Sequence, residues 1–308
     1  MSRSKTKFII NPKAGNGKLL KQWHKFQTEA IAGLGVFDYT FTEKVGHATQ
    51  VANQALNENY ETLVAVGGDG TINEVVNGFF ENGKKVNEDA RLAIVSMGTG
   101  SDFVRTVGMP IQLRRSLQII KAQKKQACDL GKAIFRARNG EERTRYFINM
   151  AGAGFSGAVV AGLGGTRKRL SPKLIYLSSV VKTLFHYESQ FVRVQVDGHF
   201  DEEIKALAIL ISNGKYCGGG MLTSPMAALD NGEFSVVIVS EIKISEGFLM
   251  LKKLYDGSLY KDAKVKIVQG RKVSVSAQTE VLTDADGEIF GRLPMTCEIL
   301  PRAINVIC

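Results

Sequence analysis

The chain contains few cysteines, and their spacing excludes two common kinds of small domain. Four cysteines are spread over 308 residues, at Cys128, Cys217, Cys297 and Cys308, and none forms a Cys-x-x-Cys pair. Zinc fingers and disulfide-rich secreted domains both need closely spaced cysteines. We therefore expect four reduced thiols in a cytoplasmic protein.

Long hydrophobic runs are also missing. No apolar run approaches the roughly 18 residues that span a bilayer, and residues 1–12 lack the apolar core of about 7–15 residues that marks a signal peptide. The composition, 44% hydrophobic and 23% charged, is typical of a globular protein with a sizeable core. The sequence thus predicts a globular protein of the cytoplasm.

Acidic residues are in the minority. The chain has 40 Lys and Arg against 30 Asp and Glu, which gives a net charge of +10. Such an excess favours nucleic acid, a phosphorylated ligand or an anionic membrane as partner. Aromatic residues seldom stand between the basic clusters, so a face for single-stranded nucleic acid is disfavoured. We expect peripheral association with a membrane surface and no nucleic-acid partner.

Several nucleotide-binding signatures are absent or incomplete. The chain has no Walker A motif and lacks the HRD and DFG motifs of protein kinases. Residues 152–157 match the pattern G-x-G-x-x-G, but residues 172–182 contain none of the acidic residues that a dinucleotide fold places about 20 positions on. We interpret this segment as a tight turn that packs a strand against a helix.

The most informative segment is residues 63–78, LVAVGGDGTINEVVNG. An apolar run ends in Gly67-Gly68-Asp69-Gly70-Thr71 and an amphipathic run follows, as in a buried strand, a glycine turn and a helix. Glycines allow a ligand to approach the backbone closely, and free N–H groups at a helix start attract phosphate. Asp69 adds a carboxylate that could hold Mg²⁺. An ordinary turn with a capping Asp is the alternative.

The order of expected elements predicts two domains. Residues 7–122 alternate between short strands and amphipathic helices, which predicts an α/β domain with a parallel sheet. From about residue 132, short strands dominate around one helix at 171–185, which predicts an antiparallel β domain. We place an α/β domain at 1–131 and a β domain at 132–300. The apolar tail, about 301–308, is expected to pack back on the first domain.

Three carboxylates stand close together near the end of the chain, in Asp284-Ala285-Asp286-Gly287-Glu288. The spacing does not match a calcium-binding loop. A polar hairpin turn would explain the segment. A catalytic carboxylate that takes a proton from a substrate hydroxyl is the alternative.

Taken in order, these motifs resemble those of the diacylglycerol kinase catalytic-domain family, and within it the soluble bacterial lipid kinases. Sphingosine kinases are more distantly similar. The resemblance covers nearly the whole chain. It runs through residues 11–15, Thr42 with 46–48, 67–74, 98–103, 129–131, 213–220 and 286–288. The GGDGT motif alone is shared with NAD kinases, whereas the ordered set is specific.

The resemblance implies an N-terminal nucleotide domain, similar to that of NAD kinases, and a C-terminal β-sandwich. It implies that Glu288, or its neighbour Asp286, activates a lipid hydroxyl, with Asp69 as a further catalytic group. It also implies ATP contacts at Asn11, Pro12, Lys13, Ala14, Gly15, Thr42, Gly67, Gly68, Asp69, Gly70, Thr71, Ile72, Asn73 and Thr99.

Two expectations concern magnesium. Asp69, Asp102 and Asp129 match a network of acids that orients Mg²⁺ and phosphates in the family. A structural Mg²⁺ site of the family would fall on Ala228, Asn231 and Glu233, but Asn231 stands where the family has Asp, and a neutral amide is a weaker ligand. Ser101 likewise stands where the family has Asn.

The leading function hypothesis is an ATP- and Mg²⁺-dependent lipid kinase whose acceptor is diacylglycerol and whose product is phosphatidic acid. An NAD kinase-like enzyme is one alternative. A catalytically weak nucleotide-binding regulator is another, motivated by Ser101 and Asn231. The sequence does not name the acceptor lipid, and a homodimer through an exposed strand edge is compatible with it.

Overall fold

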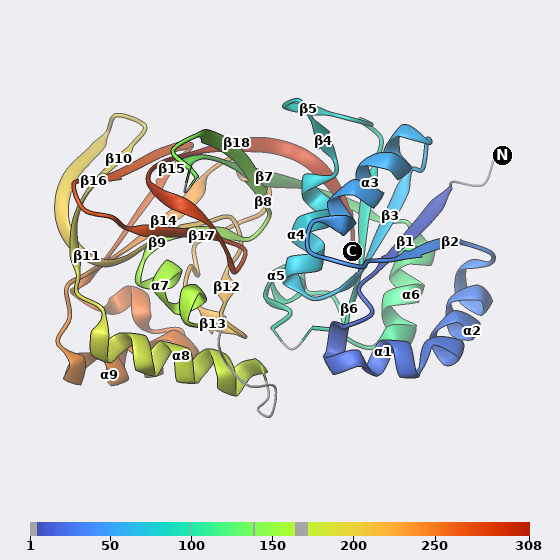
Figure 1. The fold of residues 1–308 in the computed structure, drawn as a ribbon, viewed down its shortest axis with the longest axis horizontal. Helices are drawn as coiled ribbons and strands as arrows, with labels where there is room; N and C mark the ends of the chain where they lie inside the picture. Colours follow the sequence, from blue (N-terminus) through green and yellow to red (C-terminus); the bar gives the residue numbers. More distant parts are fainter. Residues whose placement is uncertain (1–4, 99, 138, 164–171) are drawn as a thin grey trace. The chain divides into compact units, whose positions relative to one another are not determined.

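A computed structural model describes residues 5–98, 100–137, 139–163 and 172–308. The chain forms two compact units, which are described separately: residues 1–128 with 302–308, and residues 129–301. The elements of both units are labelled in Figure 1. The fold is mixed α/β. In the described part of the chain, no helix is both long and apolar enough to span a bilayer.

The first unit alternates strands and helices (Figure 1). Its strands are β1 (Thr6–Ile10), β2 (Asp38–Phe41), β3 (Thr62–Gly67), β4 (Phe80–Glu81), β5 (Lys84–Lys85) and β6 (Arg91–Ser96). Its helices are the short 3-10 turn η1 (Ala14–Gly17), α1 (Lys18–Lys21), α2 (Trp23–Leu34), α3 (His47–Asn57), α4 (Asp69–Asn77), α5 (Asp102–Thr106) and α6 (Leu113–Ala122).

Strand β1 lies between β2 and β3, and β3 pairs with β6, all in parallel. The end of the chain adds a further parallel neighbour, since residues 305–306 pair with residues 91–92 of β6. All six residues of β3 are buried, as expected for a strand covered on both faces. One face packs Phe8, Val64 and Val95 against Phe26 of α2 and Leu117 of α6.

The second unit consists mainly of antiparallel strands, which confirms the predicted β-rich C-terminal half. Its strands are β8 (Glu142–Phe147), β9 (Met150–Gly154), β10 (Gln190–Val196), β11 (Phe200–Ser212), β12 (Tyr216–Cys217), β13 (Met221–Leu222), β14 (Phe234–Ser240), β15 (Val265–Gly270), β16 (Lys272–Ala277) and β17 (Leu282–Ala285). Two long strands, β7 (Lys125–Arg136) and β18 (Glu288–Ile307), contribute residues to both units.

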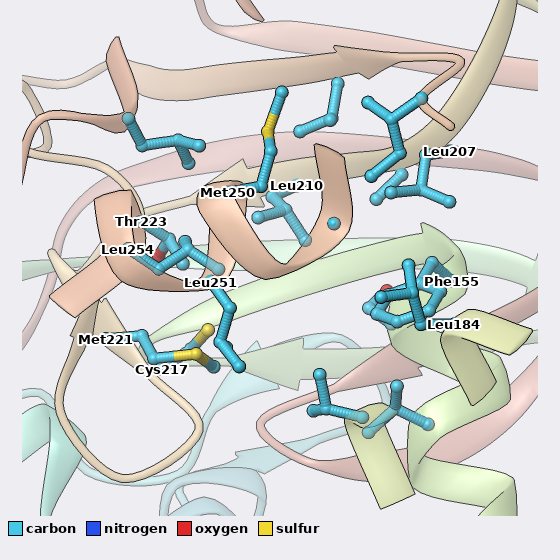
Figure 2. A pocket seen from close by; sticks show the side chains of 18 of the residues that line it. Phe155, Leu184, Leu207, Leu210, Cys217, Met221, Thr223, Met250, Leu251 and Leu254 are labelled. Carbon is cyan, nitrogen blue, oxygen red and sulfur yellow. The ribbon is translucent and has the colours of Figure 1, made fainter. Parts of the chain in front are cut away.

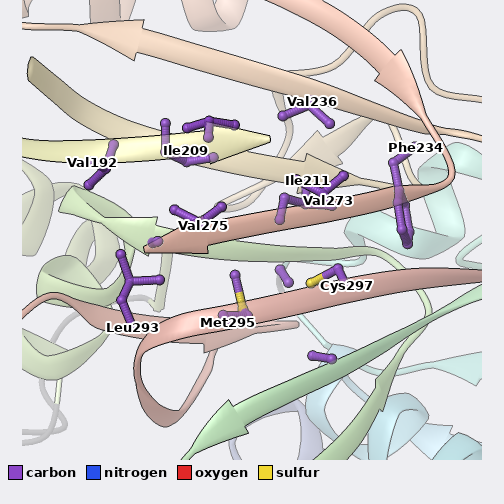
Figure 3. Packing of buried hydrophobic residues seen from close by; sticks show 14 of the residues in the cluster. Val192, Ile209, Ile211, Phe234, Val236, Val273, Val275, Leu293, Met295 and Cys297 are labelled. Carbon is purple, nitrogen blue, oxygen red and sulfur yellow. The ribbon is translucent and has the colours of Figure 1, made fainter. Parts of the chain in front are cut away.

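Buried and exposed residues alternate along the strands of this unit, and the buried ones form its core. In β10, Val192, Val194 and Val196 are buried, whereas the residues between them are exposed. Figure 3 shows Val192 with Val236 and Val273 in this core. Strands β11 and β14 are buried on their other face as well. There, a second cluster includes Leu207, Leu210, Val237 and Met250.

The residues of that second cluster pack among helices α7 (Phe155–Gly162), α8 (Pro172–His186) and α9 (Ile244–Asp256), with the short η3 (Leu259–Lys261). Figure 1 shows α7, α8 and α9 on the same side of the strands. Helix α8 corresponds to the helix expected at 171–185, whereas α9 was not expected, so the expectation of a single helix in this half was wrong. The helical spacing of Gly247, Met250, Leu251 and Leu254 was the available signal.

Candidate active-site residues

The GGDGT segment forms the turn between β3 and helix α4, which begins at Asp69 with Gly68 as its N-cap. A Cβ on Gly67 would lie 2.3 Å from the hydroxyl of Thr71, and a Cβ on Gly98 would lie 2.7 Å from the Cα of Gly68. The turns after β3 and β6 therefore meet backbone to backbone, which requires glycine. This contact holds Asp69 and the start of α4 at the carboxyl end of β3.

A polar pocket lies in the same unit. It has a volume of ≈ 120 Å³, and its lining residues are Asn11, Lys13, Thr42, Glu43, Lys44, Val45, Ala48, Thr71 and Glu74. The structure thus brings together four of the residues expected to contact ATP, namely Asn11, Lys13, Thr42 and Thr71. Asn11 binds two of the others: its amide nitrogen donates to the Thr71 hydroxyl at 3.2 Å, and its side-chain oxygen accepts the N–H of Lys13 at 2.9 Å.

Other residues expected to contact ATP lie near this pocket without lining it. Pro12 belongs to the same turn as Asn11, and Ala14 and Gly15 begin η1. On α4, Ile72 is 1% exposed and Asn73 is fully buried. The side chains of Ile72 and Asn73 therefore pack inside the protein, and any contact of these two residues with ATP would come from their backbone atoms.

Glu74 was not among the expected site residues, although it lies in the segment that carries the GGDGT motif. Its carboxylate accepts the N–H of Ala48 at 3.0 Å, and its backbone oxygen accepts the hydroxyl of Thr49 at 2.8 Å. Glu74 therefore ties the first turn of α3 to α4 and fixes one wall of the pocket. Sequence spacing gave no sign of this tie, because 26 residues separate Ala48 from Glu74.

Asp69 and Asp102 carry neighbouring carboxylates. A Cβ on Gly100 would lie 3.0 Å from Oδ2 of Asp69 and 3.5 Å from Oδ2 of Asp102. Burial raises the pKa of Asp69 above its ordinary value, and N–H groups at the start of α5, among them that of Phe103, oppose the rise. Two close carboxylates suit Mg²⁺, which commonly binds one or two of them together with substrate phosphates.

Two other residues expected to bind magnesium, Asp129 and Asn231, form hydrogen bonds within the protein. Asp129 belongs to the second unit, where its carboxylate accepts the N–H of Gly232 at 2.7 Å. In the loop that includes Ala228, the side-chain oxygen of Asn231 accepts the N–H of Glu233 at 3.1 Å. No group of three His, Cys, Asp or Glu side chains suited to a metal occurs among the residues described. Thr99 lies outside those residues.

The two acids of Asp286-Gly287-Glu288 have different surroundings. Asp286 is 9% exposed, and its carboxylate accepts three backbone N–H groups, from Ile148 at 3.0 Å, Asn149 at 3.0 Å and Met150 at 2.9 Å. Its φ of 47° places it in the left-handed region. Asp286 therefore fastens the β17–β18 turn to the segment between β8 and β9.

Glu288 begins β18 and keeps 31% of its side chain exposed. Its carboxylate forms an ion pair with Arg145 of β8, whose side chain is 25% exposed. The guanidinium holds the carboxylate in a defined direction while leaving part of it open to solvent. Arg145 was not among the expected site residues, because 143 residues separate it from Glu288.

Asp284, the third acid of this segment, is buried. Burial raises its pKa to about 6, the Ser156 hydroxyl works against the rise, and the charge of Asp286 adds to it. The Ser156 hydroxyl falls short of hydrogen-bond geometry, so Oδ1 of Asp284 has no such partner among the residues described. Asp284 is therefore neutral more readily than an ordinary aspartate.

A second cavity, with a volume of ≈ 110 Å³, lies in the second unit and is almost entirely apolar. Figure 2 shows the side chains around it, among them Phe155, Leu184, Leu210, Met250 and Leu254. They come from α7, α8, α9 and β11. Apolar cavities of similar size stay dry and accept hydrocarbon ligands.

Comparison with known proteins gives concordant family matches. Residues 5–133 match the diacylglycerol kinase catalytic domain, and residues 150–308 match the YegS C-terminal NAD kinase beta sandwich-like domain. A diacylglycerol kinase of Staphylococcus aureus (strain bovine RF122 / ET3-1) is 29% identical over 308 residues, which cover 99% of this chain and 92% of that protein.

Two solved structures have similar folds. A Bacillus anthracis (strain Sterne) protein, provisionally named a diacylglycerol kinase, superposes with a TM-score of 0.77 at 26% identity, over 100% of this chain and 98% of its own. Yeast NADH kinase with bound NADH superposes with a TM-score of 0.56 at 10% identity, over 99% and 83%. The latter likeness concerns the fold alone.

Proposed function

Because the chain belongs to the family with a diacylglycerol kinase catalytic domain and a YegS-type C-terminal domain, and is therefore a lipid kinase, we propose that it transfers the γ-phosphoryl group of ATP to diacylglycerol. The product would be phosphatidic acid, an intermediate of phospholipid synthesis. The proposal includes a requirement for Mg²⁺ and transient association with a membrane surface, where the lipid resides.

The observation that carries the proposal is the contrast between Asp286 and Glu288. Both carboxylate oxygens of Asp286 accept backbone N–H groups, so this carboxylate serves the fold. Glu288 is partly exposed, and its ion pair with Arg145 orients it. A general base must come within reach of the proton that it takes, and the exposed part of Glu288 allows this. The contrast favours Glu288 over Asp286, a choice that the sequence left open.

The nucleotide is assigned to the polar pocket of the first unit. Asn11, Thr71 and Lys13 line that pocket, and the N-terminus of α4 favours phosphate. Magnesium, when bound, would neutralise phosphate charge, and Asp69 and Asp102 are the residues that would hold it. The structural Mg²⁺ site at residues 228–233 stays a prediction, because Asn231 already binds within its own loop.

The lipid is assigned to the second unit. Its apolar cavity offers a place for acyl-chain carbons, whose burial gains about 0.8 kcal/mol per CH₂ group. The Glu288 carboxylate would take the proton of the acceptor hydroxyl as the hydroxyl oxygen bonds to phosphorus and ADP departs. Phosphoryl transfer depends mainly on positioning and charge neutralisation, to which these residues contribute.

The proposal predicts the behaviour of two matched variants. Glu288→Gln keeps the size of the side chain and removes the base, so kcat should fall about 10²–10⁴-fold with little change in the KM for ATP. Asp286→Asn should instead destabilise the chain by about 2 kcal/mol or more, because a carboxylate with three N–H donors is lost. Phosphate transfer from radiolabelled ATP and thermal unfolding measure the two effects.

The acceptor should be a water-soluble short-chain diacylglycerol, tested beside NAD and a sphingoid base. Transfer to diacylglycerol supports the proposal, and transfer to NAD alone would establish the NAD kinase alternative instead. If Glu288→Gln retains near-normal kcat, Glu288 is not the base. ATP binding without transfer to any of the three acceptors would favour the regulator alternative.

A further inference from the structure

Among the residues that the structure describes, helices α8 and α9 expose several large apolar side chains. On α8, Leu174 is 52% exposed and Phe185 52%. On α9, Ile244 is 46% exposed, Phe248 51% and Tyr255 40%. A monomeric protein usually scatters exposed apolar residues singly, so two adjacent helices with this property call for an explanation.

Helical spacing places these residues on one stripe of each helix, whereas Leu249 of α9, 53% exposed, lies about 100° around the axis from Phe248. Leu174 and Phe185 are 11 residues apart, and Ile244, Phe248 and Tyr255 follow an i, i+4, i+11 pattern, so each set lies within about 40° around its axis. The rings of Phe185 and Phe248 are in contact, with centroids 6.3 Å apart. The two stripes therefore meet, and together they form what we call the docking face.

Exposed lysines flank both stripes. Lys182 lies on α8 and Lys252 on α9, each roughly 40–80° around the helix axis from the stripe. Neither forms an ion pair with the acids of the chain that the structure describes. The pKa of Asp256 is lowered by its hydrogen bonds from Ser258 and, to a smaller extent, by the charge of Lys252, with which it forms no ion pair. The docking face thus combines apolar and aromatic side chains with accessible positive charge.

The docking face is continuous with the apolar cavity. Phe248 belongs to both, since it is half-exposed and also lines the cavity. On α8, Leu184 lines the cavity while the adjacent Phe185 is exposed. A hydrocarbon chain leaving a bilayer at this face would thus reach the cavity between the same two helices.

We propose that the docking face inserts into the surface of a bilayer containing anionic lipids. Helices with Phe, Leu and Ile beside Lys lie in the headgroup region with their apolar side chains toward the acyl chains. The lysines would be attracted to the negative potential of such a surface. This inference rests on the proposed function for its purpose, because a kinase of membrane lipids must meet the membrane somewhere.

Vesicle sedimentation of the 308-residue chain tests the docking face. The probes are neutral phosphatidylcholine vesicles and vesicles with added phosphatidylglycerol, each at low and high ionic strength. Phe185→Ser/Ile244→Ser and Lys182→Glu/Lys252→Glu should each weaken binding to the anionic vesicles about tenfold or more. Phe191→Ser and Lys25→Glu are matched controls, since both residues are exposed on other elements, and they should bind like the wild type.

Unchanged binding by either double variant would overturn the proposal, as would an equal loss in the controls. Light scattering measures the oligomeric state of each variant. If the wild type is a dimer and these substitutions convert it to a monomer, the docking face is a self-association surface and the proposal is wrong. Turnover of short-chain diacylglycerol in solution separates the two proposals. If the wild type binds anionic vesicles but phosphorylates no diacylglycerol, the proposed function fails and the docking face stands.

Discussion

Asp284 and Asp286 are two residues apart, yet their carboxylates have opposite environments. Asp286 receives three N–H donors, which stabilise its charge. Asp284 is buried beside Ser156, a residue of the apolar cavity wall, and its charge is poorly solvated. A sequence pattern of alternating acids does not distinguish these cases, because the difference arises from residues more than 100 positions away.

Asp284 should make stability depend on pH. Its folded pKa of about 6 exceeds the ordinary value of 3.8, so folding favours the protonated form. Below the ordinary pKa the Asp284 carboxyl is protonated in both the folded and the unfolded state, so it does not lower the free energy of unfolding. As pH rises between the two pKa values, the free energy of unfolding falls relative to that of a protein with a neutral side chain here. The loss is complete above the folded pKa, where it is on the order of 2–3 kcal/mol.

Asp284→Asn removes this titration. The unfolding free energy of the variant, minus that of the wild type, should therefore rise between about pH 4 and pH 7, as measured by urea denaturation at each pH. A difference that stays constant over this range would show that Asp284 does not titrate there.

At the scale of elements, the glycines of residues 152–157 serve packing, as the sequence analysis interpreted them. A Cβ on Gly157 of α7 would lie 2.7 Å from the backbone oxygen of Leu282 in β17, and a Cβ on Gly152 would lie 2.3 Å from the hydroxyl of Ser156. Helix α7 and strand β17 therefore approach at backbone distance. No nucleotide is needed to explain this glycine pattern.

Gly157→Ala should lower the unfolding free energy by about 1–3 kcal/mol, because the added methyl group overlaps a backbone that cannot move aside cheaply. Gly33→Ala in α2 is the matched control. Its added Cβ would lie 3.7 Å from the Cβ of Leu117, an ordinary contact, so the better helix propensity of alanine should prevail. Equal effects of the two substitutions on the denaturation midpoint would contradict the packing role.

The elements differed in how far the sequence predicted them. The buried strand expected before the glycine turn at Gly67 corresponds to β3, because a continuous apolar run that ends in a glycine turn leaves little ambiguity. The expected boundary between residue 300 and the apolar tail falls inside the long strand β18, since Pro301 resembles a strand break. Site residues such as Glu74 and Arg145 escaped prediction because their partners are distant in sequence.

At the scale of the whole molecule, the single tryptophan allows the unfolding of one unit to be measured separately. Trp23 lies in α2 and packs on Phe41, the residue before Thr42 of the polar pocket. Its fluorescence should therefore report unfolding of the first unit. A ligand at about 100 times its Kd stabilises a protein by roughly 2.7 kcal/mol, and ATP with Mg²⁺ should raise the unfolding temperature accordingly.

Asp69→Asn should abolish most of the Mg²⁺-dependent part of this stabilisation while ATP alone retains its smaller effect. The reason is that the substitution removes one of two neighbouring carboxylates and leaves the Asn11–Thr71 pocket in place. Thermal scans with ATP, with and without Mg²⁺, measure the difference. A variant that responds to Mg²⁺ as the wild type does would exclude Asp69 from metal binding.

Pairing of residues 305–306 with β6 delays completion of the first sheet during biosynthesis. A ribosome that has finished residue 128 must still add the 173 residues of the second unit before Arg302, the first residue of the closing segment, is made. At about 5–20 residues per second this takes roughly nine to thirty-five seconds. During that interval the outer edge of β6 has no strand partner from this segment, so the nascent chain carries an open sheet edge that chaperones would have reason to shield.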